Sequence, residues 1–504
     1  MKVHWALVIT IGLLQQQLFS QNIEKHVLES SFLEKSRTVR VWLPEEYDPS
    51  QKYATIYVFD GSYLFNAAWA NVEFLAGYGK LPHAIVVAIH FKEENRNFDM
   101  AMDFWGTGKL YKNGVNFYKY TINDLIPFID KTYSTSGHRT IIGHSMSSSY
   151  LNFFLFDNNK PVFNNYIALS QIFIGDNKKE FTKLVEREIE FPINYFTGIA
   201  LGDAETRISN PRKVEQLLDS LPINRNFSYK FEEFPLSDHG SLYTDGLSNA
   251  IKYVFKDFIG PRRNWKYSSK LNTYIHNQSK KSIASHFDSL KIDPLTYFKA
   301  EREKASTIYN MDIKLTPKDV PFVASYGKEK KDEKYMDRLT EYFEKEYPND
   351  NLLLQYIAQN YRNIGSWKKM EAYFWKYNEL PEIKGKQQYA YNYLYYSFDL
   401  FMKNPEKTWD LLNKYKLAFP KLKGINKLYG KISVDYNYKL KEGEKALLKY
   451  LKETTGSKKS QESGYLLLGK LYKKQGKFNK AKRQFEKVLK LNSSSEARQL
   501  IENL

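Results

Sequence analysis

A serine surrounded by small residues is the first place where this sequence could do chemistry. Ser145 lies in the segment "RTIIGHSMSSSY" (Arg139–Tyr150), after an apolar run that ends at Gly143. A buried strand, a tight turn and a helix in this order form a nucleophile elbow, which exposes a serine hydroxyl. The strand and helix of an elbow approach closely, so the residues two positions either side of the serine must be small. Gly143 meets this requirement fully, and Ser147 is the residue at the second position.

The motif alone also fits a serine-rich helix start, in which Ser145 only accepts hydrogen bonds from backbone N–H groups. The two interpretations differ in what else they require. A nucleophilic serine needs a base, and in proteins with such an elbow an acid and then a histidine follow the serine along the chain. The rest of the sequence therefore has to decide between them.

His239 is the histidine that fits this order. It lies in the loop "FPLSDHGSL", directly after the predicted strand Phe227–Phe234. His144 is next to the serine and would point elsewhere, while His276 and His286 lie beyond the region of alternating strands and helices. A loop histidine is often merely exposed, but the order and the strand-end position favour His239 as the base.

The acid is expected after the strand that precedes this one. The segment "IALGDAETR" follows the predicted strand Ile193–Gly202 and offers Asp203 and Glu205. Either carboxylate would orient the imidazole and stabilise the imidazolium that forms during the reaction. Each also fits an ordinary carboxylate at a helix N-terminus. The residues themselves leave this choice open.

Short apolar runs alternate with helical patterns from about residue 25 to 260. Several runs are apolar on both faces, as buried parallel strands are, and the alternation with helices predicts a mostly parallel α/β sheet with helices on both faces. An antiparallel hairpin of His26–Leu33 and Thr38–Leu43 is expected at one edge, and a helix over Tyr118–Tyr133. The predicted central strands lie in Ala54–Asp60, Ala84–His90, Arg139–Gly143, Asn165–Ser170, Ile193–Gly202 and Phe227–Phe234.

The character of the chain changes after "GPRRNW" (Gly260–Trp265). We expect a partly helical connector over residues 261–340 and an all-α repeat domain over 341–504, after an α/β domain over 21–260. In the repeat domain, Tyr465, Leu468-Gly469, Tyr472, Ala481 and Phe485 have the spacing of a tetratricopeptide repeat. An earlier stretch from Leu354 to Phe374 keeps the same spacing, and the copies between the two are degenerate. The alternative is a plain helical bundle.

The stretch from about Lys25 to Ile259 resembles the esterase D-like group of α/β-hydrolases, which includes enterochelin-type siderophore esterases and feruloyl or acetylxylan esterases. A tetratricopeptide-like tail is a recurrent companion of such domains. The resemblance rests on five segments in the order of the family: "YVFDGSYLF" (Tyr57–Phe65), "ENRNFDM" (Glu94–Met100), "LIPFIDKTYSTSGHRTIIGHSMSSS", "ALGDAE" and "SDHGS".

The resemblance implies a serine esterase with Ser145, His239 and an acid, and its acid motif favours Glu205 over Asp203. It implies an oxyanion hole from the backbone N–H groups of Met146 and Ser62. Arg96 and Asp99 are candidates for the pocket rim or for a structural ion pair, and Phe104 and Trp105 for the pocket lining. The family usually has glycines where this chain has Ser147–Ser149, which would distort the elbow if these side chains crowd the turn.

The first twenty residues are typical of a secretory signal peptide, with Lys2, an apolar stretch Trp5–Leu14 that is too short to span a bilayer, and Ser20 before the expected cleavage. No later segment is apolar enough to span a membrane. We therefore expect a secreted or periplasmic protein.

Composition narrows the remaining possibilities. The chain has no cysteine, which excludes disulfides and thiol chemistry, and its nine histidines show no His-x-x-x-His pairing of a zinc site. We expect neither a metal nor a cofactor. The net charge is +18, but much of the lysine between Lys439 and Lys490 has helical spacing and fits a solvated face; no nucleic-acid-binding signature is present.

The leading hypothesis is a secreted serine esterase that acts on a siderophore lactone, an acylated sugar or a feruloyl-type ester through an acyl-enzyme. The alternative is a catalytically degenerate hydrolase fold that acts as a binding or scaffold protein, with a protein partner on its helical repeats. Ser147 in the elbow supports the alternative, whereas an acid and a histidine at the expected places argue against it.

Overall fold

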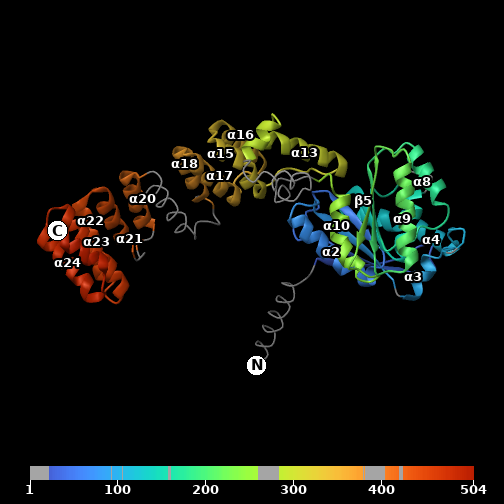
Figure 1. Ribbon diagram of the computed structural model, residues 1–504, viewed down its shortest axis with the longest axis horizontal. Coiled ribbons are helices and arrows are strands. Elements are labelled where there is room, and N and C mark those ends of the chain that lie inside the picture. Colours follow the sequence, from blue (N-terminus) through green and yellow to red (C-terminus); the bar gives the residue numbers. More distant parts are fainter. Residues whose placement is uncertain are drawn as a thin grey trace, which may run out of the picture. The chain divides into compact units, whose positions relative to one another are not determined.

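The computed structural model describes residues 22–91, 93–104, 106–156, 161–258, 283–378, 380, 403–418, 420 and 424–504. The chain divides into two compact units, one ending at Val323 and the other beginning at Ala324. The predicted signal peptide, Trp105 and His276 lie outside the described residues. Figure 1 shows the sheet in the first unit and only helices in the second.

The first unit is built on an eight-stranded sheet with the order β1-β2-β4-β3-β5-β6-β7-β8. The pairs β1–β2 and β2–β4 are antiparallel, and every other pair is parallel. This confirms the predicted mostly parallel sheet and its antiparallel edge hairpin. The strands are β1 (Ile23–Leu28), β2 (Arg37–Trp42), β3 (Tyr53–Val58), β4 (Ala84–His90), β5 (Thr135–His144), β6 (Asn165–Leu169), β7 (Ile193–Ala200) and β8 (Phe227–Phe234).

Helices cover both faces of this sheet, which is why its central strands are apolar throughout. Alternate side chains of β3 enter different cores, with Ile56 in one and Tyr57 in the other. The Ile56 core is closed by α2 (Gly61–Gly77), α10 (Leu242–Val254) and α13 (Pro294–Tyr309). The Tyr57 core is closed by α4 (Lys112–Tyr120), η1 (Thr121–Leu125), α5 (Ile126–Thr132), α6 (Met146–Tyr150), α7 (Asn152–Phe156), α8 (Asn177–Glu186) and α9 (Glu205–Ser220).

The described part of the predicted connector is more helical than its polar composition suggests. Its described part begins with α12 (Ile283–Ser289), and α13 then packs on the sheet unit through buried Ala305 and Tyr309. The Asn310 side chain donates a hydrogen bond of 2.7 Å to the carbonyl oxygen of Ser136 in β5. The two units therefore divide inside the predicted connector, after η3 (Pro317–Asp319) and α14 (Val320–Val323).

The second unit is a succession of helices, among which α17 packs on α18, α21 on α22 and α23 on α24. This confirms the predicted helical repeat region. Its helices are α15 (Ser325–Lys330), α16 (Glu333–Glu346), α17 (Asn351–Ile364), α18 (Trp367–Asn378), α20 (Pro405–Ala418), α21 (Ile425–Tyr436), α22 (Leu440–Glu453), α23 (Lys458–Lys474), α24 (Phe478–Leu491) and α25 (Ser495–Glu502).

The repeat motif has a direct packing reason. A Cβ at Gly469 of α23 would lie 2.4 Å from the ring of Phe485 in α24, so only glycine lets the two helices approach this closely. Ala481 and Phe485 are fully buried in the same core. The spacing of glycine, alanine and phenylalanine in the sequence is therefore the spacing of one helix–helix contact.

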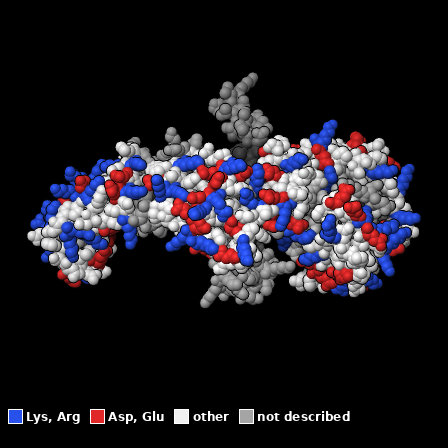
Figure 2. Space-filling view, turned by 90° about the horizontal axis from the view of Figure 1, so that it is seen from above, with Lys and Arg blue, Asp and Glu red and all other residues white. Residues whose placement is uncertain are grey.

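Basic side chains lie among acidic ones over the surface (Figure 2). In the second unit, Lys470 pairs with Glu496 at 2.6 Å and Lys477 with Glu444 at 3.2 Å. None of the helices in the described parts of the chain combines the length and the apolar character that crossing a bilayer requires.

We predict that Gly469→Ala destabilises the helical unit by about 1–3 kcal/mol, because the new methyl group overpacks the Phe485 contact. Helix propensity alone would give the opposite sign, since alanine is the better helix former. The matched control is Gly456→Ala, where a Cβ meets nothing within 4 Å. Denaturant unfolding of the full chain measures both variants, and a Gly469→Ala protein as stable as the control would contradict the packing argument.

Candidate active site

Ser145 has the strained backbone of a nucleophile elbow. It lies between the end of β5 at His144 and the start of α6 at Met146, with φ 63° and ψ −123°. A residue other than glycine rarely adopts positive φ, and such strain is held in place only by the surrounding structure. Gly143 is part of that structure, because a Cβ there would lie 2.6 Å from the backbone of Ser147. Ser145 is half-buried, so part of the residue is exposed to solvent.

Ser147 does not crowd the turn but holds it. Its Oγ donates to Asp60 Oδ2 at 2.7 Å, lies 3.0 Å from the His144 carbonyl oxygen, and accepts the His144 backbone N–H at 2.9 Å. Ser147 is fully buried, so its hydroxyl cannot bond to water and these hydrogen bonds satisfy it instead. A glycine at this position has no hydroxyl to satisfy. The expected distortion of the elbow is absent, and the serine is a hydrogen-bonded replacement for the second glycine.

Arg96 binds Asp60 rather than Asp99. Its guanidinium donates to the two Asp60 carboxylate oxygens at 2.5 and 2.9 Å, and to the His144 carbonyl oxygen at 3.2 Å. Asp99 is instead paired with Arg37 through bonds of 2.7 and 2.6 Å, so the suggested pair of Arg96 and Asp99 does not form. Arg96 therefore supports the strand end behind Ser145.

His239 lies in the loop after β8, and its acid partner is Asp203. The distance from His239 Nδ1 to Asp203 Oδ2 is 2.8 Å, and the Asp203 side chain is only 5% exposed, against 44% for His239. Glu205, which the family motif favoured, lies in the first turn of α9 with an exposed side chain, and it makes no hydrogen bond to His239 among the described residues. Asp203 lies in the turn that follows β7, where its carboxylate contacts the imidazole. The helix α9 begins at Glu205, and the Glu205 side chain is exposed instead.

The Asp203 carboxylate is kept ionised. Burial raises its pKa, but hydrogen bonds from Ser170, His239 and the Ala204 backbone N–H outweigh this and hold the pKa below its usual value. An ionised Asp203 fixes the imidazole proton on Nδ1 and leaves Nε2 as the free base.

His144 ties the elbow to the loop that carries His239. Its Nε2 lies 2.6 Å from the His239 carbonyl oxygen, and the two rings are 4.9 Å apart between centroids. Burial lowers the pKa of His144 to about 4 despite this bond, so the ring is neutral at ordinary pH. A carbonyl oxygen only accepts, so Nε2 carries the proton of His144 and donates it.

The proposed oxyanion donors lie at the starts of two helices. Met146 is the first residue of α6, and Ser62 is the second residue of α2, which directly follows β3. Because β3 and β5 are parallel neighbours, their carboxyl ends meet at the same edge of the sheet. Neither amide donates a hydrogen bond among the described residues. The Ser62 hydroxyl is occupied by the Phe91 carbonyl oxygen.

Two structural partners were missed by sequence reasoning. Asp60 was recognised only as part of a family segment, and Ser170 was not singled out, although it directly follows β6 and its Oγ contacts both Asp203 and His239. The position of Ser170 after a predicted central strand was the signal that could have found it. His286 lies on α12, where its ring contacts that of Phe287. The described residues contain no group of three or more carboxylate or imidazole side chains suited to a metal ion.

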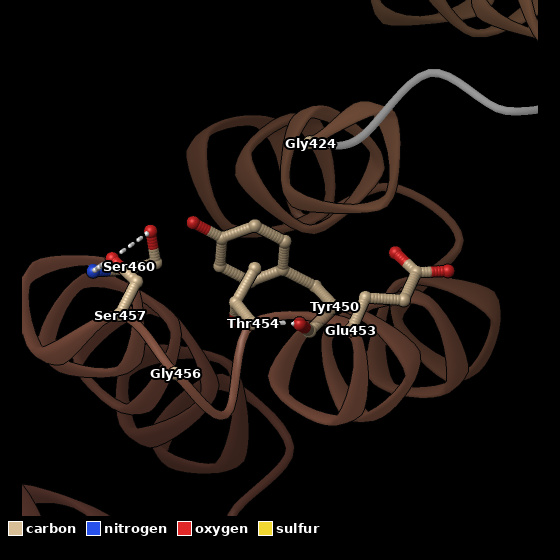
Figure 3. A pocket seen from close by; sticks show the side chains of 7 residues that line it. All are labelled: Gly424, Tyr450, Glu453, Thr454, Gly456, Ser457 and Ser460. Carbon is tan, nitrogen blue, oxygen red and sulfur yellow. Dashed lines mark hydrogen bonds between the residues drawn. The ribbon is translucent and has the colours of Figure 1, made fainter.

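The helical unit contains a separate cavity of about 450 Å³ (Figure 3), lined by Gly424, Tyr450, Glu453, Thr454, Gly456, Ser457 and Ser460. Its polar side chains bond to their neighbours. Thr454 donates to the Tyr450 carbonyl oxygen at 2.8 Å, and the Ser457 and Ser460 hydroxyls are 2.9 Å apart. None of its lining residues is a histidine.

Comparison with known proteins confirms the resemblance seen in the sequence. Residues 30–181 match the family model described as "Putative esterase", and residues 463–495 match the tetratricopeptide repeat. No curated protein matches. The esterase match supports carboxylic ester hydrolysis and includes Asp60, Arg96 and Ser145.

Solved structures similar to this chain are found at low sequence identity. An uncharacterised protein from Capnocytophaga ochracea superposes with a TM-score of 0.54 at 16% identity, covering 71% of this chain and 94% of that one. An IroE-like serine hydrolase from Shewanella oneidensis has a TM-score of 0.44 at 18% identity, covering 62% of this chain and 96% of that one. The BES protein from Bacillus cereus has a TM-score of 0.42 at 21% identity, covering 47% and 95%.

We predict that replacing Ser147 with the glycine of the usual motif destabilises the protein. Ser147→Gly and Ser147→Ala each remove the hydroxyl bonded to buried Asp60, at a cost of about 1–3 kcal/mol. Ser220→Ala, at an exposed serine on α9, is the control. Denaturant unfolding compares them, and a Ser147→Gly protein as stable as the wild type would mean that the hydroxyl contributes nothing.

The Asp203 carboxylate also predicts a pH dependence of stability. Its folded-state pKa lies below the usual 3.8, so its stabilising contribution is complete above that pH and is lost as the pH falls through the folded value. Asp203→Asn should therefore be less stable than the wild type at pH 6, with a difference that shrinks below pH 3.8. Unfolding free energies of both proteins measured from pH 6 to strongly acid conditions test this. A difference that stays constant with pH would contradict it.

Proposed function

We propose that the sheet unit is a serine carboxylic ester hydrolase. The observation that carries the proposal is the strained, accessible Ser145 on the same sheet edge as a histidine whose Nδ1 is bound to a buried carboxylate. These are the parts that acyl transfer through a serine requires. The esterase family match over residues 30–181 supports the reaction class.

The proposed reaction is acyl transfer through Ser145 with His239 as the base. His239 Nε2 takes the proton of the Ser145 hydroxyl while Oγ attacks the ester carbonyl carbon. The backbone N–H groups of Met146 and Ser62 donate hydrogen bonds to the carbonyl oxygen and stabilise the negative charge that develops on it. The leaving alcohol takes the proton back from Nε2, and a water activated in the same way by His239 releases the acid and restores Ser145.

The acid in this proposal is Asp203 and not Glu205. Asp203 is bound to the imidazole and shielded from water, whereas Glu205 is exposed to it. The sequence motif of the family placed the acid two residues later than the hydrogen bonds do. Arg96 enters the proposal as a support of the elbow.

The substrate class is proposed from the family resemblance, and the location is proposed from the first twenty residues. We propose an exported enzyme acting on a siderophore lactone, an acylated sugar or a feruloyl-type ester, with the first twenty residues as its signal peptide. A protein partner on the helical repeats is proposed from the tetratricopeptide match at residues 463–495. The alternative of a degenerate hydrolase fold was favoured by Ser147, and that support falls away because Ser147 stabilises the elbow.

Kinetics on an activated aryl ester test this proposal. Asp203→Asn should lower kcat by roughly 10²- to 10⁴-fold, because the imidazole loses the partner that fixes its tautomer. Glu205→Gln should leave kcat near the wild-type value and is the matched control, and Ser145→Ala sets the background. Loss of activity in Glu205→Gln with retention in Asp203→Asn would overturn the assignment of the acid. Equal hydrolysis by the wild type and Ser145→Ala would overturn the function.

A further inference from the structure

Ser170 contacts the two residues that form the proposed acid–base pair. It directly follows β6, between the ends of β5 and β7, and its side chain is almost fully buried. Its Oγ donates to Asp203 Oδ2 and lies 2.8 Å from His239 Nδ1. A serine hydroxyl, a carboxylate oxygen and an imidazole nitrogen therefore form a closed triangle behind the ring.

The backbone of Ser170 is held in an unusual conformation for this purpose. Its φ is 53°, a left-handed value that residues other than glycine seldom adopt. The Ser170 N–H donates to the Gly198 carbonyl oxygen at 3.1 Å, and the Ser170 carbonyl oxygen accepts from Arg207 Nη1 on α9. Bonds from two neighbouring elements thus fix the direction of the side chain, at a position where a glycine would be free of strain.

The donors and acceptors of the triangle can be satisfied in one way that leaves a working base. The Ser170 hydroxyl proton goes to Asp203 Oδ2, and the imidazole proton on Nδ1 is shared between that carboxylate oxygen and the Ser170 Oγ lone pair. The opposite tautomer, with the proton on Nε2, would place an unprotonated Nδ1 against the carboxylate. With the proton on Nδ1, Nε2 carries no proton and faces away from the triangle.

We propose that Ser170 is a positioning residue, which locks the Asp203 carboxylate and the Nδ1–H tautomer of His239 so that Nε2 is presented as the base. This inference rests on the proposed function and adds a fourth member to its catalytic group. Ser170 itself touches neither the ester nor the attacking oxygen in this account.

Two variants of Ser170 separate the effect of its hydroxyl from the effect of its backbone strain. Ser170→Ala removes the hydroxyl and keeps the strain, whereas Ser170→Gly removes both and should be the more stable of the two. Ser136→Ala is the control, because Ser136 is a similarly buried serine at the opposite end of β5. Among the described residues, its Oγ accepts the backbone N–H of His138 and contacts neither Asp203 nor His239.

With an aryl ester as substrate, both Ser170 variants should lose about tenfold in kcat with KM nearly unchanged, while Ser136→Ala retains wild-type kcat. Asp203 then accepts one bond fewer and attracts the imidazolium more strongly, so the acid limb of the kcat/KM profile should move to higher pH in both.

The other charged or titratable groups near His239 are His144, Asp203, Asp238 and Arg207. Burial lowers the pKa of His144 to about 4, and hydrogen bonds hold the pKa values of both aspartates below 3.8, so none of these three groups accounts for a limb at higher pH. Wild-type kcat in either Ser170 variant, or recovery of kcat in Ser170→Gly, would overturn the inference.

A spectroscopic measurement tests Ser170 without using activity. In protein labelled with ¹⁵N-histidine, the His239 signals are assigned by their loss in His239→Gln, and their shifts report the tautomer. The wild type should carry the proton on Nδ1 at neutral pH, and Ser170→Ala should show a mixture of tautomers. Unchanged His239 signals in a folded Ser170→Ala protein would refute the positioning role. An inactive wild type with the expected signals would refute the proposed function alone.

Discussion

The buried carboxylate of Asp60 is the group on which the site depends. It is completely inaccessible to water, at a positive φ of 59°, where β3 turns into α2. An ionised carboxylate is costly to bury unless charges and hydrogen bonds replace its water. Arg96 from α3 (Glu93–Asp99) and Ser147 from α6 provide that replacement, and both also bind His144 at the end of β5. One desolvated charge thus joins the two turns that should provide the oxyanion N–H groups.

The parallel sheet brings the other residues of the proposed site to one edge. The strand order β3-β5-β6-β7-β8 places five consecutive strand ends at one edge, each followed by a residue of the proposed reaction. These are Ser62 after β3, Ser145 after β5, Ser170 after β6, Asp203 after β7 and His239 after β8. Residues far apart in the chain meet because the carboxyl ends of parallel strands share an edge. Neutral His144 then holds the last loop against the elbow through its bond to the His239 carbonyl oxygen.

Sequence reasoning identified the parts of this arrangement that have a pattern. Apolar runs located the parallel strands, and the elbow motif and chain order indicated Ser145 and His239. The residues left the acid open between Asp203 and Glu205, and the family motif favoured Glu205, whereas the carboxylate bound to His239 is Asp203. The two residues are only two positions apart, and which of them faces the imidazole depends on where α9 begins. The partner of Arg96 was missed because an ion pair across separate turns leaves no periodic signal. Ser147 was interpreted as a defect, since its compensation lies on Asp60, far away in the chain.

The central claim is that Ser145 is an activated nucleophile whose base is His239. The most direct measurement is labelling of the purified protein with a fluorophosphonate, with the modified residue located by mass spectrometry. The account predicts one adduct, on Ser145, that is lost in Ser145→Ala and in a folded His239→Ala variant. No adduct on the folded wild type, or labelling that persists without His239, would contradict it.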